Sequence, residues 1–589
     1  MYLRMRTRRK NGKTHRYWSV AETRRLPGGK TVQKHVLYLG ELNDAQHAGW
    51  VRAIEAVDER RPEEGARQLA LFPDDQEIVP DLDIPVVRIR IDEMRLSRPR
   101  QWGGCWLAMH LWEVLDLDGF WRSRLPPSRE GTHWLNILKT LVTYRLLDPG
   151  SEWRLHRQWF DGSAMMDLLD EDVSLGQKDN LYRCLDHLLQ HRDDLFSFLK
   201  PRWADLFGET YDVLLYDLTS TYFECDPPDP PESSKKRFGY SRDRRSDCVQ
   251  VVIALVVTPQ GFPLAYEVYA GNTRDPQTLR EFLQRIETRF GKTGRVWLMD
   301  RGIPTEATLR EMRQEGVSYL VGTPKGRLAQ FEQALLERPW TAARESVRVK
   351  LVEHEREFYV YVESRDRVAK ERSMRRRRLK KLWRRLQELR QMKGQARDEL
   401  LMRLGAAKKD AGRSWALVNV RVPEAGQEVN GQTFTISLDR DRLRQVRRRE
   451  GRYLLRSNMT SERPECVWER YLLLTQVEQA FKDLKGDLSV RPIFHQKEHR
   501  IEAHIFVSFL AYCLHTTLRN LAKQQAMGLT TRTILEKLQT IQMVDVDLPT
   551  TDGHRIHLSR TTEPGTEVAL LLHRLGLELP AQPPPRICD

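Results

Sequence analysis

The chain has 589 residues, of which 97 are Lys or Arg and 82 are Asp or Glu, so its formal net charge is +15. This length exceeds one ordinary hydrophobic core, so we expect several domains, and the 40% hydrophobic content fits globular folding. The excess of basic residues suggests a polyanionic partner, DNA or RNA. A merely basic soluble protein is the alternative.

Cysteine spacing and apolar runs argue against several other classes. The seven cysteines include no Cys-x-x-Cys pair, which disfavours a zinc site of the usual spacing. Their odd number and wide spacing disfavour a disulfide framework and indicate a reducing compartment. No apolar run follows the basic N-terminus, and no stretch of about 18 apolar residues occurs, so we expect neither a signal peptide nor a membrane span. The sequence therefore predicts a cytosolic protein.

Residues 1–71 form a basic segment that predicts a β-hairpin. Strand-like runs at 16–23 and 30–39 flank a Pro27-Gly28-Gly29 turn. A basic hairpin suits contact with DNA phosphates, and a solvated edge hairpin is the alternative. Residues 72–95 are predicted to be a linker, because their first part is acidic and contains prolines.

Residues 96–207 are predicted to form an α-helical N-terminal domain, because apolar residues such as Leu107, Leu111 and Val114 recur at helical spacing. The domain is a candidate for DNA binding, although it has no clear recognition-helix motif.

Residues 208–323 predict the first part of an α/β core. Strand-like runs occur at 211–217, 249–257 and 264–269. They are followed by a helix at 276–289, a strand at 295–299, a helix at 305–314 and a strand at 317–322. This order predicts a mixed sheet with helices packed on it, and the RNase H-like fold has this order.

Residues 324–465 interrupt the core pattern and predict a long β-rich insertion. Strand-like pieces occur in it, together with a basic helical hairpin at 371–410. The hairpin is predicted to lie along DNA, and a charged surface helix pair is the alternative. Residues 466–530 return to helices as the second part of the core, and residues 531–589 form a C-terminal region with a Pro-rich tail that we expect to be disordered.

Two carboxylates stand at the ends of apolar strand-like runs. Asp217 ends the first run and Asp300 ends the run at 295–299. A carboxylate at a strand end has a fixed backbone, which suits a rigid metal ligand. Cleavage of a phosphodiester by two metal ions about 3.5–4 Å apart needs about three such carboxylates. A turn or a helix cap is the alternative for either residue taken singly.

A helix predicted at 470–486 supplies the third carboxylate. Tyr471, Glu478 and Lys485 are spaced seven residues apart, close to two helical turns, so all three project from one face. Glu478 is then a metal ligand, and the other two side chains reach a phosphate on either side. An ordinary amphipathic helix with solvent-facing Glu and Lys is the alternative.

At these residues the chain resembles the DDE transposases of bacterial insertion sequences, in particular the IS-four group. The signature of that group is Tyr-(2)-Arg-(3)-Glu-(6)-Lys, and Leu474 stands at the Arg place. Arg470 lies one turn earlier. If the phosphate contact of the signature Arg is missing, Arg at position 474 would keep or raise activity. Further similar motifs are Tyr38-Leu-Gly40, Asp217-Leu-Thr-Ser-Thr-Tyr, Gly239-Tyr-Ser-Arg-Asp243, Gly271-Asn-Thr, Asp300-Arg-Gly-Ile-Pro, Arg491-Pro492 and His499-Arg-Ile-Glu-Ala-His504-Ile.

The resemblance implies a transposase that binds the inverted repeats of its element as a homodimer, cleaves DNA and transfers strands to target DNA. It implies Asp217, Asp300 and Glu478 as catalytic ligands of two Mg²⁺ ions, with Mn²⁺ as a substitute. The expected location is the bacterial cytoplasm, at the nucleoid. The expected DNA-phosphate contacts are Tyr471, Lys485, Arg301 and Arg491, with Asn458 and His504 as weaker candidates.

Three alternatives remain open. The first is an RNase H-like nuclease without strand transfer, and the second is a catalytically silent DNA-binding descendant. The third is an RNA-binding protein, which the absence of an RNP-type or Gly-x-x-Gly motif disfavours.

Overall fold

The computed structural model describes residues 1–10, 13–25, 31–59, 87–128, 130–224, 234–273, 275–291, 294–323, 330–331, 335, 338–392, 396–460, 462–584 and 586–588. The chain divides into two compact units. Unit 1 comprises residues 1–6, 16–295 and 475–589, and unit 2 comprises residues 7–15 and 296–474. Both units mix helices and strands, as an α/β protein does.

The N-terminal segment is a three-stranded sheet followed by a helix. Its elements are β1 (Tyr2–Lys10), β2 (Lys13–Arg25), β3 (Thr31–Gly40) and α1 (Asp44–Glu59). Strands β2 and β3 pair antiparallel, which confirms the predicted hairpin strands, whereas the Pro27-Gly28-Gly29 turn lies outside the described residues. The Trp50 indole of α1 donates to the Met527 carbonyl at 2.8 Å, which fixes this segment to the C-terminal part of unit 1.

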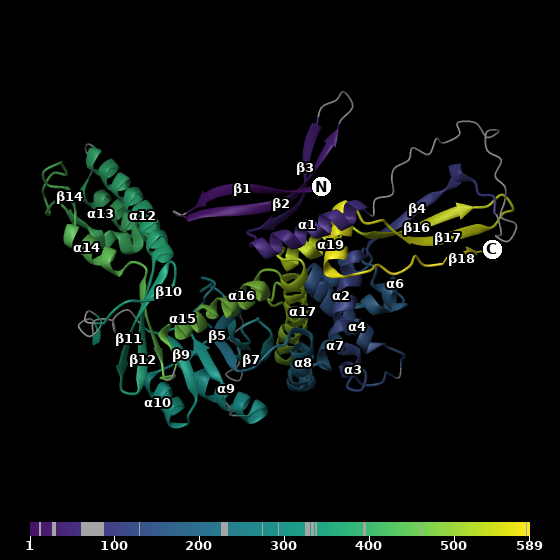
Figure 1. Cartoon of the computed structure of the whole chain (residues 1–589), viewed down its shortest axis with the longest axis horizontal. Helices are drawn as coiled ribbons and strands as arrows, with labels where there is room; N and C mark the ends of the chain where they lie inside the picture. The colour runs from purple at the N-terminus through teal and green to yellow at the C-terminus, as the bar shows by residue number, and fades with distance from the viewer. Residues whose placement is uncertain are drawn as a thin grey trace. The chain divides into compact units, whose positions relative to one another are not determined.

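Unit 1 contains a layer of helices around one long helix, α17 (Glu498–Gln525), as Figure 1 shows. This arrangement confirms the helices predicted between residues 104 and 207. The shorter helices of the layer are α2 (Gly103–Val114), α3 (Leu117–Trp121), α4 (Trp134–Leu147), α5 (Glu152–Arg154), α6 (Met165–Leu169), α7 (Lys178–Asp186), α8 (Arg192–Phe207), α18 (Thr531–Leu538) and α19 (Thr566–Leu575).

Helix α17 is the core helix of this layer. Among the described residues it is the one helix whose length and composition would allow it to cross a membrane, yet 94% of its apolar window is buried inside the fold. Burial of this kind is what the central helix of a globular unit shows, because neighbouring elements cover its apolar side chains.

A four-stranded sheet joins the start of the helical region to the C-terminal region, and the sequence did not predict it. Its order is β18 (Arg586–Cys588), β17 (Arg555–Thr561), β16 (Gln542–Pro549) and β4 (Arg95–Gln101). The expectation of a disordered tail is wrong for its end, because β18 pairs with β17. Arg100 of β4 and Asp545 of β16 form a buried ion pair at 2.8 Å across this sheet.

Unit 1 also holds an antiparallel sheet of β5 (Val213–Tyr222), β6 (Gln250–Val257) and β7 (Pro263–Ala270), followed by α9 (Asp275–Phe290). Every residue of β6 is buried, as a central strand requires. Helix α17 covers this sheet, since the Tyr512 hydroxyl donates to the Gly261 carbonyl at 2.7 Å and the Tyr266 and Phe509 rings stack at 4.0 Å. Gly261 has a φ of +89°, which the β6–β7 turn requires and which favours glycine.

Unit 2 is built on a mixed sheet whose strand order is β10–β11–β12–β15–β9–β8. Strands β8 and β9 are parallel, and the other pairs are antiparallel. The central strand β15 was not predicted from the sequence. The elements are β8 (Val296–Met299), α10 (Glu306–Gln314), β9 (Ser318–Thr323), β10 (Thr341–Arg344), β11 (Val347–His354), β12 (Glu357–Ser364), β15 (Arg452–Ser457) and α15 (Pro464–Leu472).

A helical subdomain is inserted between β12 and β15. Its elements are α12 (Arg365–Gln391), α13 (Arg397–Ala411), β13 (Val418–Arg421), β14 (Thr435–Leu438) and α14 (Arg440–Arg449). The predicted basic hairpin is therefore confirmed as α12 and α13. Leu382, Leu386, Leu389, Leu400 and Leu404 pack into a separate core, so the hairpin is a folded element. Most of its basic side chains are exposed, whereas Arg375 is buried against Glu450.

Candidate active site

The predicted site residues are carried by both units. Unit 1 carries Asp217, Glu478, Lys485 and Arg491, and unit 2 carries Asp300, Arg301 and Tyr471. Each group is described within its own unit.

Asp217 lies in the middle of β5, which continues to Tyr222. The expectation that Asp217 ends its strand is therefore wrong. The strand continues through Thr219, Ser220 and Thr221, which are buried although they are polar. Asp217 is half-buried, and one of its carboxylate oxygens accepts from the backbone N–H of Leu218 at 2.8 Å.

The face of β5 that carries Asp217 points toward the chain that follows α16 (Leu474–Lys485). Alternate residues of a strand share a face, so Thr221 lies on the Asp217 side. The Thr221 hydroxyl donates to the Val490 carbonyl at 3.4 Å, and the Ile493 N–H donates to the Tyr222 carbonyl at 3.1 Å. On the opposite face, the Tyr216 hydroxyl bonds Thr278 of α9 at 2.8 Å.

Asp243 organises the basic residues near the end of α16. The Lys485 ammonium lies 3.0 Å from the Asp243 carboxylate, and the Arg491 guanidinium forms a short ion pair with the same carboxylate. The backbone N–H of Arg242 donates to the Ser220 hydroxyl of β5 at 3.3 Å, which ties this loop to the strand. Burial lowers the pKa of the Lys485 ammonium, and Asp243 opposes that shift. Both predicted phosphate contacts thus meet at an acid whose role the sequence reasoning missed.

Two glycines of the similar motifs permit a close backbone approach beside this loop. A Cβ atom on Gly239 would lie 2.0 Å from the Gly271 carbonyl oxygen, and one on Gly271 would lie 2.1 Å from the Gln250 carbonyl oxygen. The Gln250 side-chain amide donates to the carbonyls of Tyr240 and Gly271 at 3.1 and 3.0 Å. These glycines therefore hold the Asp243 loop against β6 and β7.

In unit 2, Asp300 directly follows β8 and is exposed, as the sequence predicts. The parallel register sets Met299 beside Val321, so the chain after β8 runs beside Gly322 of β9. A Cβ atom on Gly322 would lie 3.1 Å from the Tyr471 hydroxyl and 3.4 Å from the Arg301 Cβ. Burial, together with the negative charge of Asp300, raises the pKa of Tyr471 to about 12. Unit 2 therefore brings Asp300, Arg301 and Tyr471 together.

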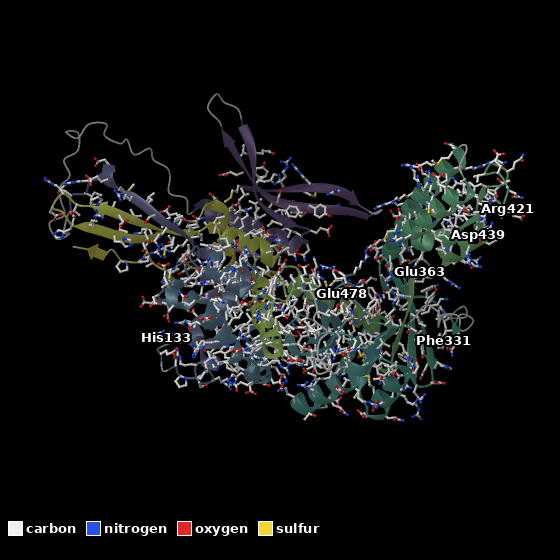
Figure 2. The ribbon with its side chains drawn as sticks, turned by 180° about the vertical axis from the view of Figure 1, so that it is seen from behind. His133, Phe331, Glu363, Arg421, Asp439 and Glu478 are labelled. Atoms are coloured by element: carbon white, nitrogen blue, oxygen red, sulfur yellow. The ribbon has the colours of Figure 1, made fainter. Side chains whose placement is uncertain are left out.

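The helix predicted at 470–486 is interrupted. Helix α15 ends at Leu472 and α16 begins at Leu474, so Tyr471 and Glu478 do not share one continuous helix. Glu478 and Lys485 do share α16, and Glu478 is exposed (Figure 2). No Gly or Pro explains the break, because the sequence there is Tyr-Leu-Leu-Leu-Thr.

Leu474, at the position of the Arg in the family signature, and Arg470 nearby have other roles. Leu474 is only 8% exposed, so it is an apolar packing residue. Arg470 forms an ion pair with Glu462 at 2.7 Å and is already engaged.

The carboxylates of Asp300 and Glu478 are exposed and make no hydrogen bond or ion pair with the described residues. Exposed carboxylate oxygens without a cationic partner are the donors that Mg²⁺ prefers. The chemistry of the donor set therefore fits a divalent cation.

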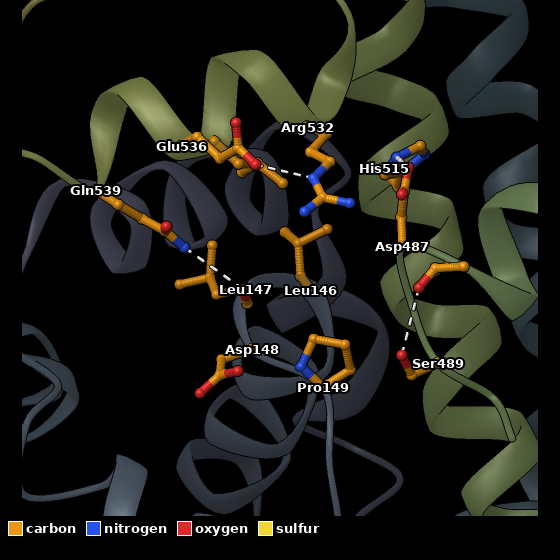
Figure 3. Close-up of a pocket in the computed structure, with 12 residues that line it drawn as sticks. Leu146, Leu147, Asp148, Pro149, Asp487, Ser489, His515, Arg532, Glu536 and Gln539 are labelled. Atoms are coloured by element: carbon orange, nitrogen blue, oxygen red, sulfur yellow. Dashed lines mark hydrogen bonds and ion pairs between the residues drawn. The ribbon is translucent and has the colours of Figure 1, made fainter. Parts of the chain in front are cut away.

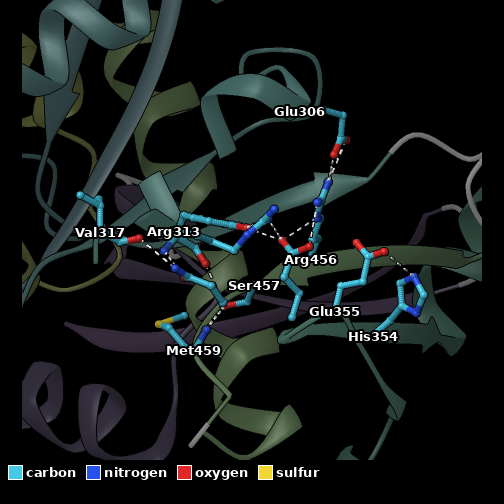
Figure 4. Close-up of polar contacts among 11 residues, drawn as sticks. Glu306, Arg313, Val317, His354, Glu355, Arg456, Ser457 and Met459 are labelled. Atoms are coloured by element: carbon cyan, nitrogen blue, oxygen red, sulfur yellow. Dashed lines mark hydrogen bonds and ion pairs between the residues drawn. The ribbon is translucent and has the colours of Figure 1, made fainter. Parts of the chain in front are cut away.

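The two weaker candidates are structural. The Asn458 side chain accepts from the Tyr319 N–H at 2.8 Å and donates to the Val317 carbonyl at 2.9 Å, which joins the end of β15 to β9. Beside it, Arg456 bonds Glu306 and Glu357 at 2.8 and 2.7 Å in a network of polar contacts (Figure 4).

His504 lies in the buried core of unit 1. Its Nδ1 is 3.3 Å from the Arg145 guanidinium and 3.6 Å from the Glu152 carboxylate. His495 also contacts Glu152, at 3.1 Å. Burial and the positive charge of Arg145 lower the pKa of His504 to about 4.

We predict that acidification destabilises the fold through His504. Above pH 6.5 the imidazole is neutral in both states. As the pH falls from 6.5 to about 4, the unfolded chain takes up a proton that the folded chain does not, which favours unfolding by about 3 kcal/mol at the lower limit. Urea unfolding across this range, compared with His504→Gln, should show a variant less sensitive to pH. Equal pH dependence in both proteins would contradict the assignment.

Burial of Leu474 changes the expectation for an arginine at that position. Leu474→Arg would bury a charge, so we predict a loss of about 2 kcal/mol or more in the free energy of unfolding. Leu474→Met keeps the volume and should cost less than about 1.5 kcal/mol. Urea unfolding of both variants measures the difference. An arginine variant as stable as the wild type would show that the side chain reaches solvent or a phosphate.

Comparison with known proteins identifies the family. The family model described as Transposase DDE domain matches residues 210–514, which is more than half of the chain. A second model, IS1634 family transposase, N-terminal domain, matches residues 3–68. No curated protein matches the chain significantly.

One solved structure with a partial likeness is "Mos1 transposase paired-end complex with left transposon end", at 12% identity and a TM-score of 0.14. The match covers 33% of this chain and 59% of that chain, so it spans less than two thirds of the length of that structure.

Since the DDE domain model spans the region that contains all three predicted acids, and the second model covers the basic N-terminal segment, this protein belongs to the DDE transposases of bacterial insertion sequences.

Proposed function

We propose that this transposase cleaves DNA at the inverted repeats of its element and joins the freed 3′ ends to target DNA, with Asp217, Asp300 and Glu478 as the metal-binding acids. The observation that carries the proposal is the presence of all three acids inside the matched DDE domain. Two of them, Asp300 and Glu478, are exposed and have no cationic partner among the described residues.

The contacts of unit 1 support the pairing of Asp217 with Glu478. Lys485 of α16 meets the Asp243 loop, which bonds Ser220 of β5. Thr221, four residues after Asp217 and on the same face of the strand, donates to the Val490 carbonyl just after α16. These two contacts place the C-terminal end of α16 and the chain after it beside β5, the strand that carries Asp217.

Unit 2 carries the remaining proposed acid, Asp300. Asp300 follows a buried strand, and Tyr471 stands beside it with a hydroxyl that stays protonated at neutral pH, because its pKa is raised to about 12. A protonated phenol donates a hydrogen bond, so Tyr471 is suited to hold a phosphate oxygen next to Asp300. Arg301, at the next position, adds positive charge for the same phosphate.

Bound Mg²⁺ or Mn²⁺ would activate the attacking hydroxyl and stabilise the leaving oxygen. The protein's own groups bind and orient the DNA. Lys485 and Arg491 share the single carboxylate of Asp243, so this cluster keeps a net positive charge for a phosphate. The order of strands and helices leads us to infer an RNase H-like core that includes residues 208–323 and 466–530.

Basic surfaces outside the core would hold the DNA. We infer that the N-terminal segment 1–71 and the α12–α14 subdomain bind DNA, and that residues 96–207 assist. Helix α14 alone contains six arginines in ten residues. Action on both element ends implies a homodimer on DNA, at the nucleoid in the cytoplasm.

We predict that Asp300→Asn and Glu478→Gln abolish Mg²⁺-dependent cleavage and leave DNA binding nearly intact, since a neutral amide keeps the shape but not the charge that a metal ion needs. The assay uses purified protein and labelled DNA from the flank of its own gene, and it scores cleaved and joined products. Glu469→Gln, an exposed acid of α15, is the matched control and should remain active.

The products separate the competing functions. Cleavage and joining that are both lost in the two variants support the transposase. Cleavage without joining in the wild type favours a nuclease, and binding without cleavage favours a silent descendant. Cleavage activity that survives Glu478→Gln would contradict the assignment of Glu478 as a metal-binding acid.

We also predict that α12 contributes to DNA affinity through its charge. Arg376, Lys380 and Arg384 are exposed and spaced along one face of the helix. Replacing all three with Gln should weaken binding and reduce the slope of log affinity against log salt by about 2 to 3. The charge-preserving set Arg376→Lys, Lys380→Arg and Arg384→Lys should keep the wild-type slope. An unchanged slope in the Gln variant would exclude DNA contact by this face.

A further inference from the structure

A second cluster of candidate metal ligands lies in unit 1, apart from the predicted catalytic acids. Asp483 of α16, Asp487 just after that helix and His515 of α17 each offer one ligand atom, and these atoms lie within 4.8 Å of one another. We call these three residues the His515 cluster. Asp483 comes five residues after Glu478, which turns it about 140° away around the helix.

His515 is buried and has no hydrogen-bond partner in the part of the chain that the structure describes. Its side chain is 3% exposed, and neither ring nitrogen makes a hydrogen bond. Nδ1 lies 3.8 Å from the Asp483 carboxylate, and Nε2 lies 3.5 Å from the Asp487 carboxylate. A buried imidazole without a partner costs folding free energy, so a ligand that satisfies it would stabilise the fold.

The gap between Nε2 and Asp487 is too long for a good hydrogen bond and has the right length for two ligands of one ion. Metal–nitrogen and metal–oxygen bonds of about 2.1 Å at a tetrahedral angle place the two ligand atoms about 3.4 Å apart. The observed separation is 3.5 Å.

Asp483 faces Nδ1, on the opposite side of the imidazole from Asp487, and two hydrogen bonds fix its position. It accepts from the Gln479 amide at 2.5 Å and from the Arg519 guanidinium at 2.9 Å. Because it faces Nδ1, it cannot share an ion with Nε2. A carboxylate on the second ring nitrogen of a metal-bound histidine fixes the tautomer and strengthens the ligand.

The Asp487 side opens into a cavity of about 390 Å³, which Figure 3 shows. His515 and Asp487 form part of its wall, together with Ser489, Arg532 and Glu536. Arg532 is paired with Glu536 at 2.8 Å, which moderates its repulsion of a cation. Asp487 is 33% exposed, so an ion can enter from solvent, and the cavity has room for water molecules that complete its coordination.

We propose that the His515 cluster binds one divalent transition-metal ion through His515 Nε2 and the Asp487 carboxylate, with Asp483 as the positioning residue for the imidazole. The imidazole donor selects Zn²⁺ or Co²⁺ over Mg²⁺, which prefers oxygen ligands. The ion would connect the end of α16 to α17 and so brace the helix that carries Glu478.

The test uses the full chain, stripped of metal and kept in excess Mg²⁺ so that the carboxylate site is occupied. Co²⁺ is titrated while its visible absorption is recorded. The expected result is one equivalent of saturable Co²⁺ binding that Zn²⁺ displaces and Mg²⁺ does not. Asp483→Asn should weaken this binding about 10- to 100-fold, as loss of the carboxylate behind a liganding histidine does.

Two further variants decide the assignment. Asp487→Asn replaces a partly exposed residue, so the protein should fold, and it should lose the saturable Co²⁺ site. Asp148→Asn alters another acid in the wall of the same cavity and should keep it. Absence of Co²⁺ binding in the wild type, displacement by Mg²⁺, or unchanged binding in Asp487→Asn would each overturn the proposal.

Discussion

Burial of α17 is the constraint on which the rest of unit 1 depends. The middle of the helix is covered by other elements, so a polar side chain there is stabilised when it finds a partner inside the protein. Tyr512 bonds the turn between β6 and β7, and Arg519 bonds Asp483 on α16. The same helix thus fixes the sheet that contains Asp217 and the helix that contains Glu478. Precise placement of two acids on different elements needs a rigid common reference, and α17 supplies it.

The local pattern of the sequence predicted the elements that bury an apolar face, and it failed where pairing is long-range or polar. Strands β6 and β7 and helix α9 agree with the prediction to within about two residues, because their apolar residues follow the period of the element. The sheet of β4 and β16–β18 was missed, since β4 and its partner β16 lie more than 400 residues apart and the strands carry many charges. Asp217 was placed at a strand end because the apolar run stops there, yet buried threonines continue the strand.

In the candidate site, too, local sequence patterns predicted some features and missed others. The glycine motifs could be recognised from the sequence, because residue type and spacing carry the signal for a close backbone approach, whereas the assignment of the three acids as metal ligands stays a prediction. The sequence did not predict the break between α15 and α16 at Leu473, since apolar residues keep helical spacing on both sides of it. Asp243 was noted only as part of a motif. Its function depends on two cations that come from positions 485 and 491, and no local pattern records that meeting.

The Asp243 contacts also explain how Lys485 and Arg491, the proposed phosphate contacts, can lie together in the absence of DNA. Two buried or half-buried cations at one place repel each other and lose hydration, which is expensive without a counterion. One carboxylate offsets part of this cost and fixes the orientation of both side chains. The two cations carry one more positive charge than the Asp243 carboxylate neutralises. A phosphate would therefore be attracted to this cluster without any rearrangement of the protein. Lys485 has its pKa lowered by burial and still keeps Asp243 at 3.0 Å.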